Sequence, residues 1–453
     1  MANLDFDVFA ASRGMPAPLS GTVQPFKIAV IGDSYVADTG STDPKSFGYA
    51  MAAALRAKYG DAGAGYVPVI STSGSVLISM SFDNNIPQYG RWTDPRRTMA
   101  AAGIASTMTG GIGATDTNQM TFSPGANNSY GRGVVDTLSV ARVFYTLRSS
   151  SPRPGLIIRP SNLGGSDYRA RVISSGADFT GTISGSTLTA SAVTGLIPRG
   201  GALVSGSGVT ANSVLATIST DTNTTAGGAG NYKLSQVSTV ASGVAMTASS
   251  PEILALDTIQ TAVYNSVTGY NNNIAIGNMN GDIIVHGVEY YNGQKGVTVT
   301  QLGYGGISAY QVAGLDDATQ RRFWQLAEFD LVIICLGQNG KTYFGPEAFA
   351  NHMSTIISQV KSCPRTKVIL MRQLDASDSL TSYHPQYDAV YQQLALAYGC
   401  GYYDERTASP SLVNYATANA AGLMLDGGHG NFQANTIIGN DLASKIFLPI
   451  VTG

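Results

Sequence analysis

Short, continuously apolar runs alternate with helix-patterned segments along the last third of this chain. DLVIICLG (330–337) and TKVILMRQ (366–373) have the length and content of buried strands. Helix-type spacing of apolar residues fills the segments 318–329, 346–363, 386–399 and 433–450. A strand that is apolar throughout must be covered on both faces, which is typical of parallel sheets flanked by crossover helices. The pattern therefore predicts an α/β fold built on a doubly wound parallel sheet.

The same alternation opens the chain. FKIAVIG (26–32) predicts a buried strand, and SFGYAMAAALRAKYG (46–60) predicts a helix that ends at a glycine. KGVTVTQLG (295–303) predicts a strand that runs into a glycine turn. We therefore expect one α/β domain in two pieces. The expected boundaries are 1–25 for an N-terminal arm, 26–85 and 296–453 for the two pieces of the domain, and 86–295 for an insert.

The segment between the two pieces has no helical pattern. Short runs of alternating apolar and polar residues, bounded by turn residues, predict strands at 134–148, 168–175 and 281–291. This pattern favours a β-rich insert, a β-sandwich.

Residues 176–250, nested inside this insert, hold 12 Ser, 13 Thr and 12 Gly in 75 residues. The segment carries four charges, on Asp178, Arg199, Asp221 and Lys233. Ser/Gly-rich sequence can form a flexible linker. Val, Leu and Ile recur between the turns, however, and a linker has no need of them. We therefore favour a small folded β module over a linker.

The charge balance excludes some functions. The 453 residues carry 27 basic and 29 acidic side chains, so there is no electrostatic footprint for nucleic acid. Only 12% of residues are charged, against about 25% in an average domain, which argues against a helical bundle. No apolar run reaches the length of a membrane span. The N-terminus lacks a basic segment followed by an apolar stretch, so we expect synthesis in the cytoplasm without a secretion signal.

The three cysteines are predicted to be ordinary reduced thiols. Cys335, Cys363 and Cys400 cannot form a disulfide framework, and none lies in a CxxC motif. Cys335 lies in an apolar run and is expected in the core. We find no cluster of His, Cys and carboxylate residues with metal-ligand spacing, and we expect no cofactor.

Two motifs have the residue types of nucleophilic catalysis. Ser34 follows the first predicted strand in IGDSYV, at the end of the strand where open α/β sheets bind their ligands. Asp426 and His429 lie three residues apart in DGGH, so the carboxylate can orient an imidazole that takes the serine proton. Each motif alone also suits a turn or helix cap. The other histidines, His286, His352 and His384, are expected to be structural or solvated.

Two further glycine-containing motifs follow predicted strands. GYGGIS (303–308) and GQN (337–339) can supply a backbone N–H and a side-chain amide to an oxyanion. The alternative for each is an ordinary strand-to-helix turn. As an ordered set at strand ends of one domain, the four motifs favour catalysis.

This set resembles the SGNH (GDSL-type) hydrolase family, whose four sequence blocks supply Ser, Gly, Asn and His on a flavodoxin-like α/β fold. The resemblance covers about 26–70 and 296–453. It implies Ser34 as nucleophile, Asp426 and His429 as orienting acid and base, and an oxyanion hole of Ser34, Gly306 and Asn339; Gly303 is the less favoured glycine. One departure is Gly340, where many relatives carry Asp or Glu after the asparagine.

The interrupted layout resembles SGNH enzymes that remove O-acetyl groups from peptidoglycan and other glycans, and that carry a carbohydrate-binding-like β domain in this gap. This resemblance implies an O-acetylated polysaccharide as substrate, with Tyr35 and Tyr304 as candidates to stack on sugar rings. Packing at the domain edge is the alternative for both tyrosines.

The nested segment resembles modules of bacteriophage tail fibres and tailspikes. That implies a virion protein, a homotrimer, and contacts with other virion proteins. Two other functions stay open: a non-catalytic, lectin-like receptor-binding protein on the same scaffold, and a cellular lipase or thioesterase.

Overall fold

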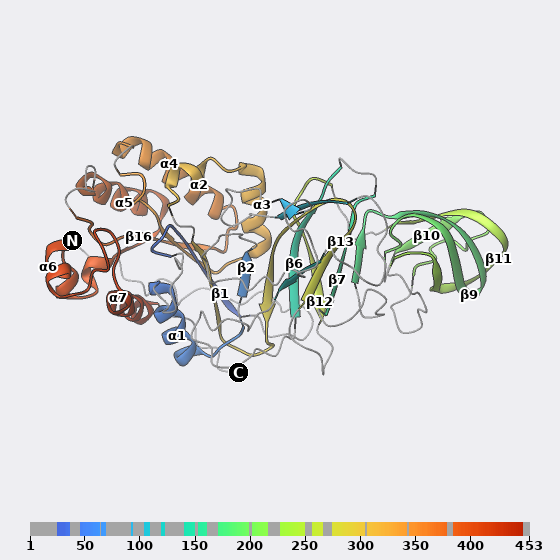
Figure 1. The fold of residues 1–453 in the computed structure, drawn as a ribbon, viewed down its shortest axis with the longest axis horizontal. Coiled ribbons are helices and arrows are strands. Elements are labelled where there is room, and N and C mark those ends of the chain that lie inside the picture. The colour runs from blue at the N-terminus through green and yellow to red at the C-terminus, as the bar shows by residue number, and fades with distance from the viewer. Residues whose placement is uncertain are drawn as a thin grey trace.

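The computed structural model of the chain describes three sheets that follow one another along the longest axis of the molecule (Figure 1). The residues that it describes are 25–36, 46–63, 65–68, 92–93, 104–108, 119–122, 140–149, 153–160, 171–198, 202–215, 227–249, 256–265, 274–303, 306–341, 344–377 and 384–446.

The first sheet is parallel and five-stranded, in the order β14-β1-β15-β16-β17. Its strands are β1 (Phe26–Gly32), β14 (Val297–Gly303), β15 (Leu331–Cys335), β16 (Lys367–Arg372) and β17 (Gly401–Asp404). Every neighbouring pair runs parallel, with Gly32 level with both Gly303 and Cys335. The predicted α/β class is therefore confirmed, and segments far apart in the sequence share this sheet.

Helices cover both faces of this sheet. They are α1 (Phe47–Tyr59), α2 (Ala309–Ala313), α3 (Asp317–Ala327), α4 (Pro346–Val360), α5 (His384–Tyr398), α6 (Tyr415–Ala420) and α7 (Phe432–Lys445), with the 3-10 turns η3 (Glu405–Thr407) and η4 (Pro410–Leu412). Side chains alternate along β1, so Ile28 and Val30 pack with α1 and α7, while Ala29 and Ile31 pack with α3, α4 and α5. Among the helices that the structure describes, none is long and apolar enough to cross a membrane.

The second sheet is antiparallel and centres on the long strand β13. Its strands are β2 (Gly65–Pro68), β3 (Trp92–Thr93), β4 (Ile104–Met108), β5 (Gln119–Phe122), β6 (Val140–Leu147), β7 (Gly155–Pro160), β8 (Arg171–Ser174), β12 (Gln260–Asn265) and β13 (Ile274–Tyr291). The first half of β13 pairs with β5 and β7, and its second half pairs with β2, β4 and β6. The β-rich character predicted for this region is confirmed.

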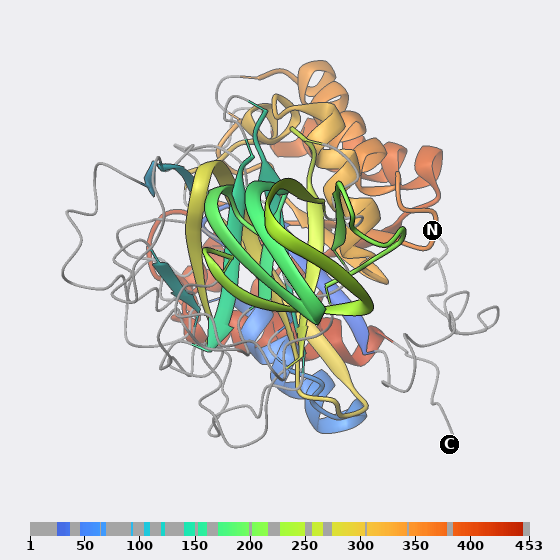
Figure 2. The ribbon, with the colours of Figure 1, turned by 90° about the vertical axis from the view of Figure 1, so that its right-hand side faces the viewer.

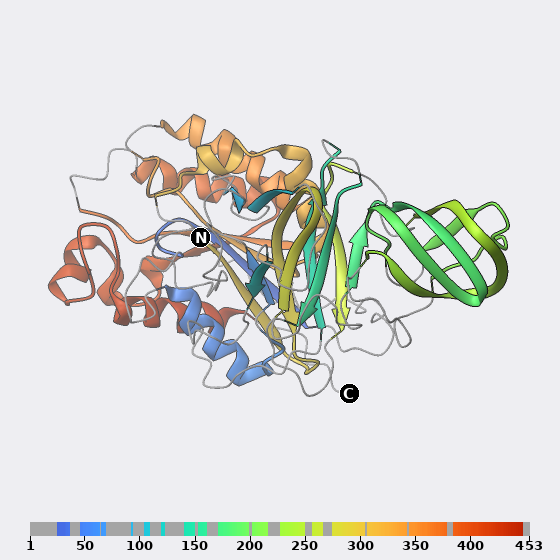
Figure 3. The same cartoon turned by 45° about the vertical axis from the view of Figure 1, so that its right-hand side comes forward.

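The third sheet lies at the far end of the molecule, on the right in Figure 1. It consists of β9 (Ala177–Gly195), β10 (Leu203–Gly206) and β11 (Gly230–Ser249), in the order β10-β11-β9. β9 and β11 are long, and Figures 2 and 3 show them curling over one another. The sheet encloses its own apolar cluster, which includes Phe179, Leu188, Leu234 and Met246. The segment 176–250 thus contains a folded β module.

The antiparallel sheet is fixed to the α/β part by side chains from both. The Lys27 ammonium of β1 lies 2.8 Å from a carboxylate oxygen of Glu289 on β13, and both side chains are buried. Arg142 of β6 binds the other oxygen of that carboxylate. The rings of Tyr66, Phe144 and Phe323 pack against one another in the same region.

The predicted domain limits stay predictions, and residues 1–24 and 69–91 lie outside the described residues.

Candidate active site

The turn after β1 places Ser34 at the carboxyl edge of the parallel sheet. The Val36 N–H donates to the Asp33 carbonyl at 3.0 Å, which closes the turn around the serine. A Cβ on Gly32 would lie 2.2 Å from the Val36 side chain and 2.9 Å from the Cys335 carbonyl. Only glycine allows this close approach of the turn to β15, so the sequence GDS determines the local geometry.

The loop before α7 presents His429 to this turn. A backbone bridge joins Met424 to Gly430, and the Leu425 N–H donates to the His429 carbonyl at 2.8 Å. Asn431 caps the first turn of α7 by accepting from the Ala434 N–H. The histidine is therefore held by a closed loop on one side and a capped helix on the other.

Ser34, His429 and Asp426 form one hydrogen-bonded chain. The Ser34 Oγ lies 2.8 Å from His429 Nε2. His429 Nδ1 lies 2.9 and 3.0 Å from the two carboxylate oxygens of Asp426. A carboxylate can only accept, so Nδ1 carries the proton and Nε2 is left to accept from the serine hydroxyl. The structure thus brings together the three residues that the sequence placed in one catalytic set.

Backbone groups of the same loop hold Asp426 in its ionised form. Burial works to raise the pKa of this carboxyl. Hydrogen bonds from the Gly428 N–H, the His429 ring and the His429 N–H outweigh burial and lower the pKa below its usual value. Both N–H donors lie 2.7 Å from Oδ1. The acid that orients the imidazole therefore stays charged at neutral pH.

The two predicted oxyanion loops touch one another. The Asn339 amide donates one N–H to the Ile307 carbonyl at 3.0 Å, next to Gly306. An amide NH₂ has two hydrogens, so the second N–H of Asn339 stays available for a substrate oxygen. Gly306 has a φ of +78°, a conformation that glycine adopts without strain, and it is exposed. Gly303 lies in β14, in register with Gly32.

The position of the Tyr35 ring does not suit its predicted role of stacking on a sugar ring. Its side chain is only 4% exposed, and its ring packs against His429 with centroids 5.2 Å apart. A ring buried in this way has no open face for a sugar, so the structure contradicts the stacking role and supports the packing alternative. Tyr304, the other tyrosine predicted to stack, lies outside the described residues.

Two of the other histidines, His286 and His352, have structural contacts. His286 is buried and lies 2.8 Å from the Thr146 hydroxyl. His352 packs against the rings of Tyr310 and Phe344. His384 is the first residue of α5. The three cysteines are free, as predicted, and all three are buried, which had been expected for Cys335.

The sequence motifs do not point to a set of buried polar residues that lies beneath Ser34. Asp33 is fully buried and accepts from the Tyr35 N–H and from Gln373 Nε2, at 3.0 and 2.9 Å. Burial raises the pKa of Asp33 to about 6, although the Gln373 hydrogen bond works to lower it. Gln373 follows directly after β16, at the same carboxyl edge as Ser34, and that position is the signal that could have identified it.

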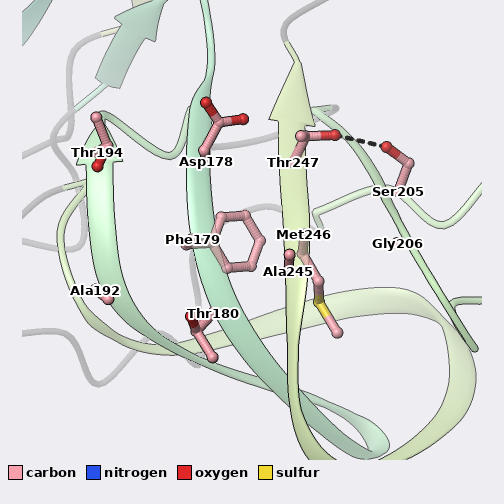
Figure 4. A pocket seen from close by; sticks show the side chains of 10 residues that line it. All are labelled: Asp178, Phe179, Thr180, Ala192, Thr194, Ser205, Gly206, Ala245, Met246 and Thr247. Carbon is pink, nitrogen blue, oxygen red and sulfur yellow. Dashed lines mark hydrogen bonds between the residues drawn. The ribbon is translucent and has the colours of Figure 1, made fainter.

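A separate hollow of about 480 Å³ lies on the β9–β11 module. Figure 4 shows Asp178, Thr194 and Thr247 around Phe179, with the Thr247 and Ser205 hydroxyls hydrogen-bonded at 2.6 Å. The Asp178 carboxylate is engaged by Arg153. No residue of the Ser34–His429–Asp426 chain lines this hollow, so it is distinct from the candidate active site.

Comparisons with known proteins add structural likenesses at low sequence identity. No family model matches the chain, and no curated protein matches it. A solved structure of a peptidoglycan O-acetylesterase matches over 93% of this chain and 90% of its own, at 13% identity and a TM-score of 0.49. Axe2, an acetylxylan esterase from Geobacillus stearothermophilus, matches over 34% of this chain and 75% of its own, at 17% identity and a TM-score of 0.28. LAE5, an alpha/beta hydrolase from the metagenome of Lake Arreo, Spain, matches over 33% and 72%, at 18% identity and a TM-score of 0.27.

Proposed function

We propose that this chain is a serine esterase that removes O-acetyl groups from a bacterial surface polysaccharide. The observation that carries the proposal is the hydrogen-bonded chain from Ser34 through His429 to Asp426. The contact between the Asn339 amide and the Gly306–Ile307 backbone supports it, because acyl transfer needs donors for the oxyanion. A protein that only binds its ligand has no use for this arrangement.

In the proposed mechanism, the Ser34 Oγ attacks the ester carbonyl carbon while His429 Nε2 takes the hydroxyl proton. Asp426 stabilises the imidazolium that forms. The Asn339 amide and the backbone N–H groups of Gly306 and Ser34 bind the oxyanion. The intermediate collapses, His429 returns the proton to the leaving alcohol, and acetyl-Ser34 remains. Water, deprotonated by His429, then releases acetate and restores the serine.

The polysaccharide substrate is proposed from the sequence resemblance to carbohydrate O-acetylesterases. The same resemblance implies a small acyl group, whereas a lipase or thioesterase needs a long apolar acyl pocket. Turnover of p-nitrophenyl esters with short and long acyl chains separates these functions, because a deacetylase should strongly prefer the acetyl ester. Acetate release from a panel of acetylated capsules, O-antigens and peptidoglycan then identifies the glycan.

The test of the esterase is hydrolysis of p-nitrophenyl acetate by the wild type, Ser34→Ala and Ser358→Ala. Ser358 is also half-buried but lies on α4, away from the site, so its variant controls for the loss of a hydroxyl. We expect Ser34→Ala to lower kcat by at least about 10³-fold and Ser358→Ala to match the wild type. Equal rates for all three would reject the esterase and favour a lectin-like binding protein.

We further propose that the chain is made in a host cytoplasm and works in a bacteriophage tail as a homotrimer. The support is the resemblance of the Ser/Thr/Gly-rich module to those of tail fibres and tailspikes. Light scattering on the purified protein is the test, and we expect three times the chain mass of 47.1 kDa. The mass of a monomer at all protein concentrations in the micromolar range would contradict the proposed trimer.

A further inference from the structure

Gln373 lies where three strands of the parallel sheet end side by side. It directly follows β16, which pairs with β15, and β15 pairs with β1. Its side chain is 4% exposed. A buried amide is costly unless its donor and acceptor groups are both satisfied, so its partners determine what it does there.

The two ends of this amide bind the two catalytic loops. Gln373 Nε2 donates to Asp33 Oδ1 at 2.9 Å, and it lies 3.4 Å from the Cys335 carbonyl. Gln373 Oε1 accepts from the Gln338 N–H at 2.8 Å. Asp33 precedes Ser34, and Gln338 precedes Asn339. One side chain therefore joins the turn of the nucleophile to the loop of the oxyanion amide.

A second contact between the same loops involves the base. Gln338 Nε2 lies 3.3 Å from the Tyr35 hydroxyl, and the Tyr35 ring packs against His429. Asp33 Oδ1 also accepts from the Tyr35 N–H, so the Asp33 side chain bridges to the backbone just beyond Ser34. The loop that Gln373 holds thus contacts the ring that supports the imidazole.

We propose that Gln373 is a positioning residue that holds Ser34 and Asn339 in the correct position relative to one another during acyl transfer. This inference rests on the proposed esterase function. The attacking oxygen and the oxyanion donor must act on the same carbonyl group, and a misplacement of about 1 Å can cost about 100-fold in rate. A glutamine suits the role because one amide both donates to Asp33 and accepts from the Gln338 N–H.

The first test compares Gln373→Met with Gln359→Met on p-nitrophenyl acetate. Gln359 is also buried and also donates to a carboxylate, that of Asp317, but it lies on α4 away from the site. We expect Gln373→Met to lower kcat by about 100-fold with KM changed by less than about threefold. We expect Gln359→Met to keep the wild-type kcat. Circular dichroism and melting temperatures establish that both variants are folded.

The second test is Gln373→Glu, which remains informative if the methionine variant does not fold. When its new carboxyl is protonated, this variant can donate to Asp33 and accept from the Gln338 N–H, as the amide does. Burial raises the pKa of Asp33 to about 6, so at pH 8 the ionised carboxyl of the variant faces an ionised Asp33 with like charge, whereas at pH 5 the two carboxyls hold a proton between them. The ratio of kcat in the variant to kcat in the wild type should therefore rise at least about tenfold from pH 8 to pH 5.

This ratio reports on the pair formed by Asp33 and the introduced carboxyl, because the other charged or titratable groups around Asp33 are the same in both proteins. They are Tyr35 in the turn after β1, Cys335 of β15, Lys341 in the loop beyond it, Arg372 of β16, Tyr391 of α5, Glu405 of η3, and His429 and Asp426 at the site.

The outcomes separate the two proposals. Absence of Ser34-dependent hydrolysis in the wild type itself would reject the esterase. An active wild type combined with a folded Gln373→Met variant of unchanged kcat would reject the positioning role alone. A flat Gln373→Glu ratio across pH would also reject it, because a purely structural side chain has no reason to regain function on protonation.

Discussion

At the scale of single residues, the most unusual group near the site is the carboxyl of Glu405. It is fully buried, it accepts from the Leu374 N–H at 2.8 Å, and it lies 3.9 Å from the Cys335 thiol. Burial raises the pKa of Glu405 to about 8, outweighing the hydrogen bond from Leu374 and the charge of Arg372, which lower it. At neutral pH the folded protein therefore holds this carboxyl largely protonated.

This pKa makes the stability of the protein depend on pH. In the unfolded chain Glu405 titrates near its ordinary value of 4.5. The folded state thus binds the extra proton, and the free energy of unfolding falls as pH rises from about 4.5 to about 8. Glu405→Gln keeps an acceptor for the Leu374 N–H and removes this pH-dependent loss of stability. We therefore expect the free energy of unfolding of the variant, relative to that of the wild type, to rise by about 3–4 kcal/mol between pH 5 and pH 8.

Urea unfolding at the two pH values measures this difference. Glu347→Gln, an exposed change in the first turn of α4, is the matched control and should show little pH dependence relative to the wild type. If Glu405→Gln and the wild type lose stability in parallel, Glu405 is ionised in the folded state and the assignment is wrong.

The residues that sequence could identify are those in contiguous motifs. DGGH brings its acid and base together within one loop, and GDS and GQN each follow a recognisable apolar strand. The place of Gln373 after an apolar strand could mark it as a residue of the carboxyl edge, but its partner Asp33 is 340 positions away, and only the order of strands in the sheet brings the two together. For Tyr35 the sequence leaves sugar stacking and packing both open, because the exposure of its ring cannot be inferred from neighbouring residues.

At the scale of elements, a buried ion cluster joins the parallel and antiparallel sheets. Glu289 of β13 lies between Lys27 of β1 and Arg142 of β6. Burial alone would raise the pKa of Glu289, but the charges of Arg142 and Lys27 outweigh it and lower the pKa to about 2. The carboxylate is therefore ionised at neutral pH and compensates the buried Lys27 ammonium and the half-buried Arg142 guanidinium.

Removal of the Glu289 charge should weaken this junction strongly. Glu289→Gln leaves the buried Lys27 and the half-buried Arg142 without a carboxylate, and removing one partner of a buried ion pair typically costs about 3–5 kcal/mol. We expect calorimetry to show a lower melting temperature for the variant at neutral pH. As pH falls from about 4.5 to about 2, the wild type loses the same charge, so the difference in melting temperature between the two proteins should shrink. Asp257→Asn removes an exposed partner of Arg148 and should leave the melting temperature nearly unchanged. Equal melting temperatures for both variants and the wild type would contradict the role given to the cluster.

Element positions were predictable where one physical pattern dominates. The strand at 26–32 was predicted with its observed limits, because a short apolar run ends at a glycine. β17 was missed, since GYYD has two tyrosines and no aliphatic run, and its place is set by pairing with β16. β13 begins at Ile274, well before the predicted start at 281, because pairing with β5 and β7 extends it.

At the scale of the whole molecule, the β9–β11 module is attached by two adjacent chain segments. Ala177 at the start of β9 pairs with Ala248 near the end of β11. Paired residues of antiparallel strands have their Cα atoms about 5 Å apart, so the chain leaves the antiparallel sheet and returns to nearly the same place. The three strands of the module pair only with one another among the described strands. Sequence could suggest the module from its composition but not this adjacency of its ends.

This geometry predicts that the module can be removed without loss of the active site. Replacing residues 177–248 by an Asn-Gly turn closes the gap with a connection that suits two antiparallel ends. The apolar cluster of the module is separate from the clusters on the two faces of the parallel sheet, so its removal leaves those cores intact. We expect a folded protein whose kcat/KM on p-nitrophenyl acetate stays within about twofold of the wild type, as judged by steady-state kinetics with Ser34→Ala as the inactive reference. A folded but inactive product would show that the module acts on the catalytic residues, because nothing else distinguishes the two chains.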